Sequence, residues 1–384
     1  MATLSSQDAS LVGKSLRAED LRVVEIDVVA DPRWEQFVNS HPDSLVYHHP
    51  SWLQVLQREY DQKCLGLAVV GLAGEVQAGM PLLYTKGFPL QARNPSAGRR
   101  LSSLPRTPLA GPLSLRREAT VALLREAVRR VQVERGLHLQ MKVQAPELDN
   151  LVQGIARVRW RTSYVLQLPA ASADIRFGNS SNHSHLKWAM KKAVAEGLRV
   201  RPAQTETDLR GWYEIYLDTM RRNAVPPRPY RFFLAIWNLL APQGLMQLLL
   251  AESSSNCGCN PIAGLLLLKY KQTVSYAFGA CCQRGLSQHA NDLLHWEAIH
   301  EACRAGFRLY DFGEVPEGED ELARFKRKWN TQPVLMHRYY YPSPSALAGT
   351  AYPAGPLWGF AAAVWRGLPL KMTAVLGDWI YRYL

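Results

Sequence analysis

The chain has 384 residues, 47% of them hydrophobic, which is enough to bury the cores of two ordinary domains and is not typical of a disordered protein. The 45 lysines and arginines exceed the 33 aspartates and glutamates, and the net charge of +12 favours anionic partners such as nucleic acid, a nucleotide diphosphate or an acidic membrane surface. Residues 1–20 contain no apolar signal-peptide core, and no run of about 18 uncharged apolar residues occurs elsewhere. We therefore expect a cytoplasmic protein, and peripheral contact with the inner face of the plasma membrane stays open.

The cysteines and histidines do not have the spacing of a metal site. None of the six cysteines forms a pair with the two-residue gap that is typical of zinc ligands, and the sequence has no H-E-x-x-H. The P-loop, G-x-G-x-x-G and G-x-S-x-G motifs are absent too, so kinase, dinucleotide and hydrolase functions have no support. We expect no metal, no permanently bound cofactor and a reducing compartment.

The first half of the chain is predicted to combine strands and helices. Its predicted elements are a strand at 21–29, helices at 31–37 and 50–60, a hairpin of strands at 65–72 and 76–84, a helix at 116–135 and a strand at 137–143. The segment 86–112 is rich in Gly, Pro, Ser and Arg and is too long for a simple connection. Loops of this length are often functional.

The second half follows a change of composition at 169–180, which we interpret as a connection between domains. Its predicted elements are a helix at 183–196, a strand at 198–201, helices at 206–222 and 230–240, strands at 245–252, 262–269 and 273–280, a helix at 291–305, a strand at 307–312, a basic helix at 320–329 and a strand at 334–341. The order of elements predicts an α/β (α+β) fold in which the two halves are alike.

A loop between a predicted strand and the helix at 291–305 has the composition of an anion site. Unpaired amides at a helix N-terminus bind phosphate or carboxylate oxygens, and Gly285 permits close approach of the backbone. The candidate donor- or phosphate-binding residues are Arg284, Gly285, Ser287 and Asn291. The alternative is that Asn291 only caps a core helix.

Two carboxylates, Asp311 and Glu314, end a short apolar strand, at the position from which α/β sheets present polar side chains to ligands. Either one is a candidate to accept a proton from an attacking amine. The alternative is an aspartate that anchors a tight turn before Gly313.

Two basic helices are the remaining candidates in the second half. In the helix at 320–329, Phe325 lies on an apolar face, and Lys326 lies off it, where its ammonium could meet a phosphate or a developing oxyanion. In the helix at 183–196, Lys187 and Lys191 suit a polyanionic donor. A solvated surface explains each charge run equally simply.

The C-terminal residues 346–384 mix tryptophan and aliphatic residues with arginine and lysine. Aromatic and basic residues together are typical of a bilayer interface. A helix that packs on the preceding domain explains the same pattern, and both interpretations stay open.

Five blocks in order, GLLLLKY, TVSYAFGA, ANDLLHWEAIHEACRAGF, LYDFG and LARFKRKWN, resemble the C-terminal acyltransferase domain of FemAB-related proteins. The segments HLKWAMKKAVAEGLRV and YHHPSWLQVL are similar to two further helices of that family, so the resemblance covers about residues 21–341. It implies two GNAT-like lobes, each a mixed, mostly antiparallel sheet flanked by helices. The predicted organisation is a lead-in at 1–20, a first lobe at 21–168, a connection at 169–180, an acyltransferase lobe at 181–341 and an amphipathic tail at 342–384.

The resemblance also implies a reaction, in which an amine attacks an activated acyl group. Cell-wall members take aminoacyl-tRNA as donor and a peptidoglycan precursor as acceptor, single-domain relatives use acyl-CoA, and other members accompany exopolysaccharide synthesis. The Phe-Lys motif of the family falls on Phe325 and Lys326, where the lysine is expected to contact the donor. The chain lacks the inserted helical hairpin of some cell-wall members, which disfavours tRNA.

We expect direct transfer without a covalent enzyme intermediate, because no Cys or Ser has a recognisable base. Lys326 and amides at 287–291 would stabilise the acyl oxygen, and Asp311 or Glu314 would take the amine proton. The prediction is an N-acyltransferase acting on an amine of a cell-envelope or polysaccharide precursor, with a nucleotide- or lipid-linked sugar as the anionic partner and no DNA. The alternatives are an acyl-CoA-dependent N-acetyltransferase for a small molecule or nucleotide sugar, and a non-catalytic precursor-binding protein.

Overall fold

The computed structural model describes residues 21–86, 99–144, 147–177, 179–253, 261–342 and 356–381. The predicted lead-in at 1–20, much of the predicted loop at 86–112 and the cysteines Cys257 and Cys259 lie outside the described residues. A mixed sheet of 13 strands runs through the described chain, in the order β1-β2-β3-β4-β6-β13-β7-β12-β11-β10-β9-β8, with β5 paired to β3. The predicted α/β class is confirmed, and the sheets of the two halves are joined into one.

The first half contains three helices and six strands among its described residues, up to the end of β6. They are β1 Arg22–Ile26, α1 Pro32–Ser40, α2 Pro50–Tyr60, β2 Leu65–Val70, β3 Val76–Thr85, β4 Arg100–Ser102, β5 Leu113–Ser114, α3 Arg117–Val133 and β6 His138–Val143. β2 and β3 form the predicted antiparallel hairpin.

The rest of the described chain contains the remaining strands and helices. They are β7 Ala156–Gln167, α4 Ser180–Ala195, β8 Leu198–Pro202, α5 Glu206–Arg222, α6 Tyr230–Leu240, β9 Met246–Ser253, β10 Ala263–Tyr270, β11 Thr273–Cys281, α7 Gln283–Ser287, α8 Ala290–Arg304, β12 Leu309–Val315, α9 Asp320–Arg327, β13 Gln332–Tyr341, α10 Pro356–Gly367 and α11 Leu370–Tyr381. Short 3₁₀ turns lie at Val46–His48, Ser172–Asp174 and Ala241–Gln243.

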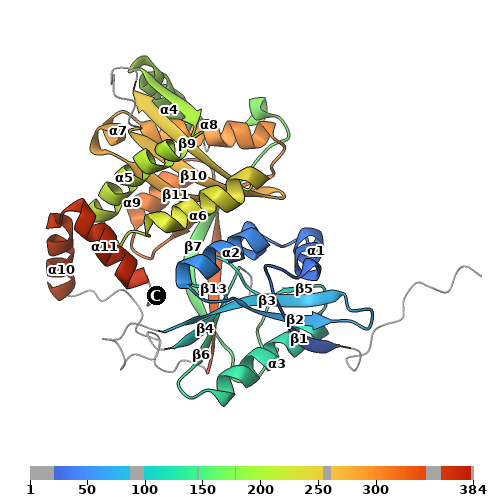
Figure 1. Cartoon of the computed structure of the whole chain (residues 1–384). Coiled ribbons are helices and arrows are strands. Elements are labelled where there is room, and N and C mark those ends of the chain that lie inside the picture. Colours follow the sequence, from blue (N-terminus) through green and yellow to red (C-terminus); the bar gives the residue numbers. More distant parts are fainter. Residues whose placement is uncertain are drawn as a thin grey trace, which may run out of the picture.

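Two long strands from distant parts of the sequence hold the halves together. β13 pairs antiparallel with β6 of the first half on one side and with β7 on the other. β7 in turn pairs with β12. In Figure 1, these two strands run between an upper lobe, built around β8–β12, and a lower lobe, built around β1–β6. The sequence analysis missed β7 as a strand, and the boundary at 169–180 stays a prediction.

The lobes also share a hydrophobic core where α2 of the lower lobe meets α6 of the upper lobe (Figure 1). Trp52 and Phe232 are both buried there, and their rings meet edge to face at 6.1 Å. Beside them, the buried guanidinium of Arg228 donates a hydrogen bond of 2.8 Å to the buried carboxylate of Glu59. Apolar packing and an ion pair therefore fix the two lobes against each other.

The C-terminal helices α10 and α11 form a hairpin beside α5 (Figure 1). Within the described ranges, we find no helix with both the length and the hydropathy needed to cross a bilayer. Residues 356–381 of the predicted tail thus form two helices, which contact α5 of the upper lobe.

Candidate active site

A cavity of about 590 Å³ lies between the two lobes, and residues of both lobes line it. β12, α9 and β11 of the upper lobe contribute Asp311, Glu314, Lys326 and Ser275, and Arg100 is among the contributions of the lower lobe. The cavity lies where β11 and β12 separate: their parallel pairing ends at Ser275 and Asp311. Three predicted catalytic residues, Lys326, Asp311 and Glu314, therefore lie in one cavity.

Asp311 is a carboxylate held in place from two sides. Its Oδ1 accepts hydrogen bonds from the hydroxyl of Ser163, at 2.9 Å, and from the backbone N–H of Gly313, at 2.8 Å. Burial raises the pKa of Asp311, and these two hydrogen bonds and Lys326 oppose that change. A carboxylate with a raised pKa at a cavity wall is suited to accept a proton.

Lys326 is 3% exposed, which differs from the surface position that its charge run would favour. Its Nζ donates to three consecutive carbonyl oxygens of β12, those of Phe312, Gly313 and Glu314, at 2.6, 2.8 and 3.1 Å. Burial lowers the pKa of Lys326 to about 8. The ammonium closes a bulge in β12, where the pairing with β7 shifts register between Asp311 and Glu314.

Two side chains of β7 contact the carboxylate of Glu314. The indole Nε1 of Trp160 donates to its Oε2 at 3.3 Å, and the guanidinium of Arg161 lies 3.5 Å from the same oxygen. Because both oxygens of a carboxylate accept hydrogen bonds, these contacts leave Glu314 able to face the cavity. Asp311 and Glu314 are thus two carboxylates in different surroundings.

The lower lobe lines the cavity with cations that the sequence analysis did not identify. Arg100, Lys142 and Arg338 come from β4, β6 and β13, which are neighbours only in the folded sheet. The Nε atoms of both arginines are buried without a hydrogen-bond partner among the described residues. Burial lowers the pKa of Lys142 well below its usual range, although its Nζ donates to the carbonyls of Leu104 and Thr107. A cluster of one buried and two partly buried cations is suited to an anionic ligand.

The end of the C-terminal hairpin also reaches the cavity. Tyr381, the last residue of α11, lines it, and its ring lies under the guanidinium groups of Arg106, at 4.9 Å, and Arg228, at 5.4 Å. The tail therefore forms part of the cavity wall beside the joint between the lobes.

The loop after β11 does not reach the cavity, contrary to the predicted convergence. Arg284, Gly285, Ser287 and Asn291 are not among the residues that line it. Gly285 is buried, and a Cβ there would lie 2.8 Å from the Sγ of Cys281, so close packing explains this glycine. Asn291 lies inside α8 and does not cap it, since the helix follows His289. Ser287 donates to the carbonyl of Arg284 within α7.

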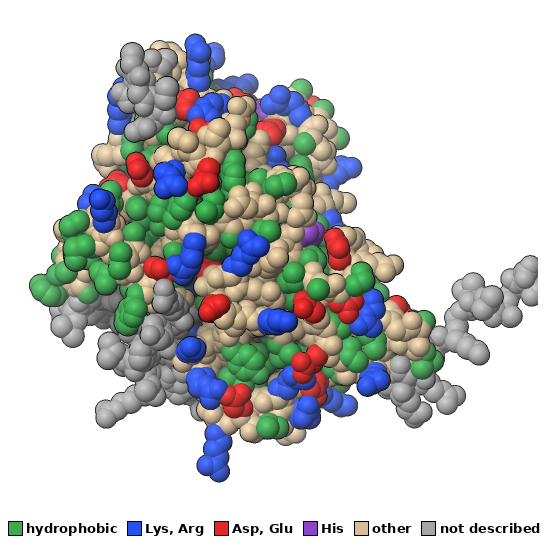
Figure 2. Space-filling view, viewed as in Figure 1, with side chains coloured by type: hydrophobic (Ala, Val, Ile, Leu, Met, Phe, Trp, Pro, Cys, Tyr) green, Lys and Arg blue, Asp and Glu red, His purple; other side chains and the backbone are tan. Residues whose placement is uncertain are grey.

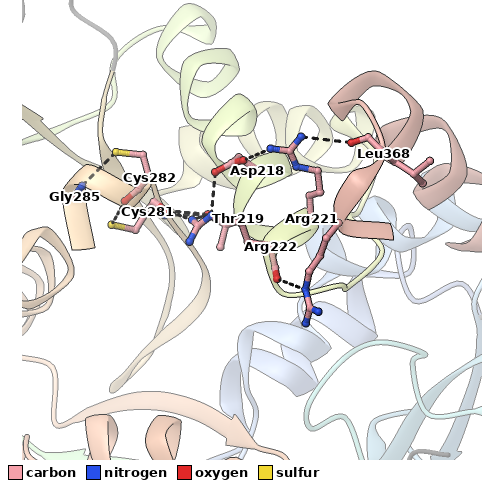
Figure 3. Close-up of polar contacts among 9 residues, drawn as sticks. Asp218, Thr219, Arg221, Arg222, Cys281, Cys282, Gly285 and Leu368 are labelled. Carbon is pink, nitrogen blue, oxygen red and sulfur yellow. Dashed lines mark hydrogen bonds and ion pairs between the residues drawn. The ribbon is translucent and has the colours of Figure 1, made fainter. Parts of the chain in front are cut away.

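The strand end before this loop is tied to α5 (Figure 3). Thr219 and Arg222 of α5 both donate to the carbonyl of Cys281, and the Cys281 N–H donates back to the Thr219 hydroxyl at 3.2 Å. One residue earlier, Arg221 donates to the carbonyl of Leu368 in the turn of the C-terminal hairpin, as Figure 3 also shows. The end of α5 therefore connects the loop after β11 with the hairpin.

Three other predicted binding residues lie outside the cavity. Phe325 lines a separate surface hollow, where the ammonium of Lys328 lies 4.4 Å from its ring. Lys187 and Lys191 are exposed on α4. A solvated helix face accounts for both lysines.

No group of three or more His, Cys, Asp or Glu side chains in the described part of the chain is arranged to hold a metal ion. Four cysteines, Cys64, Cys281, Cys282 and Cys303, are free thiols.

Comparison with known proteins defines the class of this site. Residues 180–327 match the family model of the acetyltransferase (GNAT) domain, which coincides with the predicted acyltransferase lobe. The match to this segment and the fold define the chain as an acyltransferase, and acyltransferases of the GNAT type take an acyl-CoA as co-substrate. No curated protein matches the chain in sequence.

Solved structures extend the likeness over both lobes. FemX aligns with a TM-score of 0.60 at 16% identity, covering 82% of this chain and 96% of its own. A C-terminal domain assigned to a lysylphosphatidylglycerol synthetase of Agrobacterium fabrum has a TM-score of 0.55 at 12% identity, covering 91% and 96%. L-PGS from Bacillus licheniformis has a TM-score of 0.53 at 11% identity, covering 89% and 98%. The predicted FemAB-like, two-lobed GNAT fold is confirmed, and at these identities the likeness concerns the fold.

Proposed function

We propose that this chain transfers an acyl or aminoacyl group to an amine of a phosphate-bearing cell-envelope or polysaccharide precursor, in the cavity between its lobes. One observation carries the proposal: the partly buried carboxylate of Asp311 lines a cavity to which both lobes also contribute cations. The carboxylate suits an amine that must lose a proton, and the cations suit an acceptor with an anionic group beside that amine.

The reaction needs one bond to form and one to break. The amine nitrogen of the acceptor attacks the acyl carbonyl carbon, and the bond from that carbon to the sulfur of a thioester, or to the ester oxygen of an aminoacyl donor, breaks. Asp311 takes the proton from the amine, directly or through a water molecule, and the leaving group carries away the electron pair. No covalent enzyme intermediate is required, so orientation of the two substrates supplies most of the rate.

Lys326 has a positioning role in this scheme. All three N–H donors of its ammonium are used by carbonyls of β12, so a direct contact with the donor would require it to release one of them. Through these bonds it holds the bulge that orients Asp311. The family resemblance led us to expect that Lys326 contacts the donor; we propose instead that it holds Asp311 in place through the bulge of β12.

The cations point to phosphate or another strong anion on the acceptor. Arg100 and Arg338 each have a buried Nε without a partner among the described residues, and unpaired buried donors of a charged group are costly. A phosphate or diphosphate would accept from them at the same time. One of the structural neighbours is a domain assigned to a lysylphosphatidylglycerol synthetase. Lysylphosphatidylglycerol is an aminoacyl group joined to a phospholipid, which agrees with a phosphate-bearing acceptor.

The test is acyl transfer by the purified chain with two donors, acetyl-CoA and aminoacyl-tRNA, and a panel of nucleotide-linked and lipid-linked amino sugars. We expect Asp311→Asn to lower kcat by about 10²–10⁴-fold, because it removes the proton acceptor and keeps the shape. Glu317→Gln, an exposed carboxylate between β12 and α9, is the matched control and should retain activity. Sensitivity to ribonuclease or release of free coenzyme A identifies the donor.

Two results would overturn the proposal. Turnover that Asp311→Asn leaves unchanged would remove Asp311 from the reaction. No turnover with any donor, together with a small molecule retained by the purified chain and identified by mass spectrometry, would favour the non-catalytic binding protein.

A further inference from the structure

The outer face of α11 is made of large apolar side chains. Met372, Val375, Leu376 and Trp379 follow one another at spacings of three and four residues, so they lie on one side of the helix. They are 50%, 70%, 37% and 45% exposed. Side chains of this size at this spacing are typical of a helix face that is covered by something else.

The inner face of the same helix carries smaller or more polar residues. Thr373, Gly377 and Tyr381, four residues apart, are buried against the upper lobe. A Cβ at Gly377 would lie 2.5 Å from the carbonyl oxygen of Pro227, so only a glycine permits this approach. The helix is therefore packed by its small side, and most of its large apolar surface is left outside.

The neighbouring helix α10 extends this apolar surface. Phe360 and Val364, one turn apart, are 70% and 50% exposed. In Figure 2, hydrophobic side chains gather at the left of the molecule, where Figure 1 shows α10 and α11. We refer to Phe360, Val364, Met372, Val375, Leu376 and Trp379 together as the apolar face of the hairpin.

The charges around this face are basic. Arg366 and Lys371 are exposed within the hairpin, and its acidic residue, Asp378, is paired with Arg231, whose Nη1 donates to it at 2.6 Å. The whole chain carries a net charge of +12. An apolar helix face with aromatic residues and flanking cations complements a bilayer surface that contains anionic lipids.

The hairpin is fixed to the molecule in this orientation. Arg221 donates to the carbonyl of Leu368 at 3.4 Å, as Figure 3 shows. The Nε of Arg366 donates to the carbonyl of Arg222 at 3.1 Å, so α10 and the turn after it are tied to the end of α5. At the other end of α11, Tyr381 lines the cavity. The hairpin therefore extends from the end of α5 to the wall of the cavity.

We propose that the α10–α11 hairpin docks on the surface of an anionic lipid bilayer, with its apolar face in the interfacial region and Lys371 at the lipid headgroups. The contact is peripheral, since neither helix is long enough to cross a bilayer. Docking on the bilayer does not depend on the proposed acyl transfer. The further idea that docking delivers a lipid-linked acceptor to the cavity does rest on the proposed function. A second copy of the chain is the competing occupant, and the test separates the two.

The experiment measures co-sedimentation of the full chain with vesicles of phosphatidylcholine alone or of phosphatidylcholine with phosphatidylglycerol. We expect binding to the anionic vesicles that weakens as salt is added. The double variant Val375→Ser/Trp379→Ser should lower the partition coefficient by about tenfold or more. The matched control is Leu72→Ser/Val133→Ser, which removes two apolar side chains of the lower lobe that are more exposed, at 75% and 77%. Thermal unfolding verifies that each variant is folded.

The outcomes divide cleanly. Binding that the hairpin variant loses and the control keeps supports docking. A wild-type chain that ignores anionic vesicles, or a hairpin variant that binds them like the wild type, overturns it. A wild-type dimer in light scattering that becomes a monomer in the hairpin variant, without vesicle binding, assigns the face to a second copy. Asp311→Asn should bind vesicles normally, so failure of the proposed transfer and failure of docking are distinguishable.

Discussion

The ammonium of Lys326 has three N–H donors, and three carbonyl oxygens of β12 accept them. This arrangement requires the protonated form, because a neutral amine has only two N–H groups. Burial opposes the charge and lowers the pKa of the group to about 8. The three carbonyls thus favour the charged form of Lys326, and burial places its pKa only slightly above neutral pH.

A decline in activity should follow from this at alkaline pH. Above about pH 8, Lys326 loses its proton, one carbonyl of the bulge loses its partner, and kcat should fall. The Lys326→Arg variant stays charged, so its pH–rate profile should lack this limb, even if its maximum is lower. A profile of kcat from pH 6 to pH 10 for both proteins is the measurement.

Stability provides the control for that experiment. The folded-state pKa of Lys326 lies below the unfolded value of 10.5, so between about pH 8 and that value the unfolded chain binds more protons. The contribution of this group to the free energy of unfolding therefore rises with pH while activity falls. A parallel loss of both quantities would contradict the assignment of the limb to Lys326.

Residues of the site differ in how well the sequence predicts them. The Phe-Lys motif and the strand end identify Lys326 and Asp311, since both carry the family resemblance. The burial of Lys326 could not be predicted, because the carbonyls that surround it belong to β12 and are exposed by a bulge. A charge run in a sequence does not reveal which of its members turns inward.

At the scale of the element, the bulge of β12 depends on one glycine. Gly313 has a φ of +76°, in the left-handed region that favours glycine, and its N–H and carbonyl bond Asp311 and Lys326. Gly318, in the turn before α9, has a φ of +89° but bonds neither residue. Both glycines have a backbone conformation that other residues rarely adopt, and only Gly313 bonds residues of the candidate site.

Alanine at each of these positions separates strain from function. We expect both Gly313→Ala and Gly318→Ala to lower the free energy of unfolding by about 1–2 kcal/mol, measured in urea. Only Gly313→Ala should also lower kcat, because it displaces the bulge that orients Asp311. Equal kinetic effects of the two variants would show that the bulge does not position the carboxylate.

The elements themselves were predicted best where local chemistry defines their ends. The helix at 50–60 matches α2, which begins at Pro50, and the helix at 206–222 matches α5, whose Thr205 and Asp208 form a capping box. β7 was missed because arginines alternate along it, a pattern that predicts an exposed segment. Its stability comes from β12 and β13, which lie more than a hundred residues later in the sequence.

At the scale of the whole molecule, one buried ion pair joins the lobes. Glu59 and Arg228 are 1% and 3% exposed in their side chains, and Arg228 also donates to the carbonyl of Arg106 at 2.8 Å. Replacing one partner of such a pair leaves the other charge buried without compensation. The joint between the lobes is therefore sensitive to a single carboxylate.

The Glu59→Gln variant should lower the free energy of unfolding by about 3–5 kcal/mol. Glu196→Gln, which removes an exposed carboxylate 3.9 Å from Lys192, should change it by less than about 1 kcal/mol. Urea unfolding followed by circular dichroism measures both. Equal and small effects would mean that the lobes are held by their shared apolar core alone.

The arrangement of the whole sheet explains why the cations of the cavity could not be predicted from the sequence. Arg100, Lys142 and Arg338 lie on β4, β6 and β13, and nothing in their spacing brings them together. Lys142 gave a usable signal, since a long cation between Met141 and Val143 in a strand requires a partner or a ligand. Its meaning depends on which strands become neighbours.

The insertion of β13 between β6 and β7 also sets the order in which the molecule can be completed during synthesis. Until residues 332–341 emerge from the ribosome, β6 is paired only along its short contact with β4, and its other edge is open. At about 5–20 residues per second, roughly 10–40 s pass between the synthesis of β6 and that of β13. The nascent chain carries an unfinished sheet for that time, and the cavity forms only after β13 has been made.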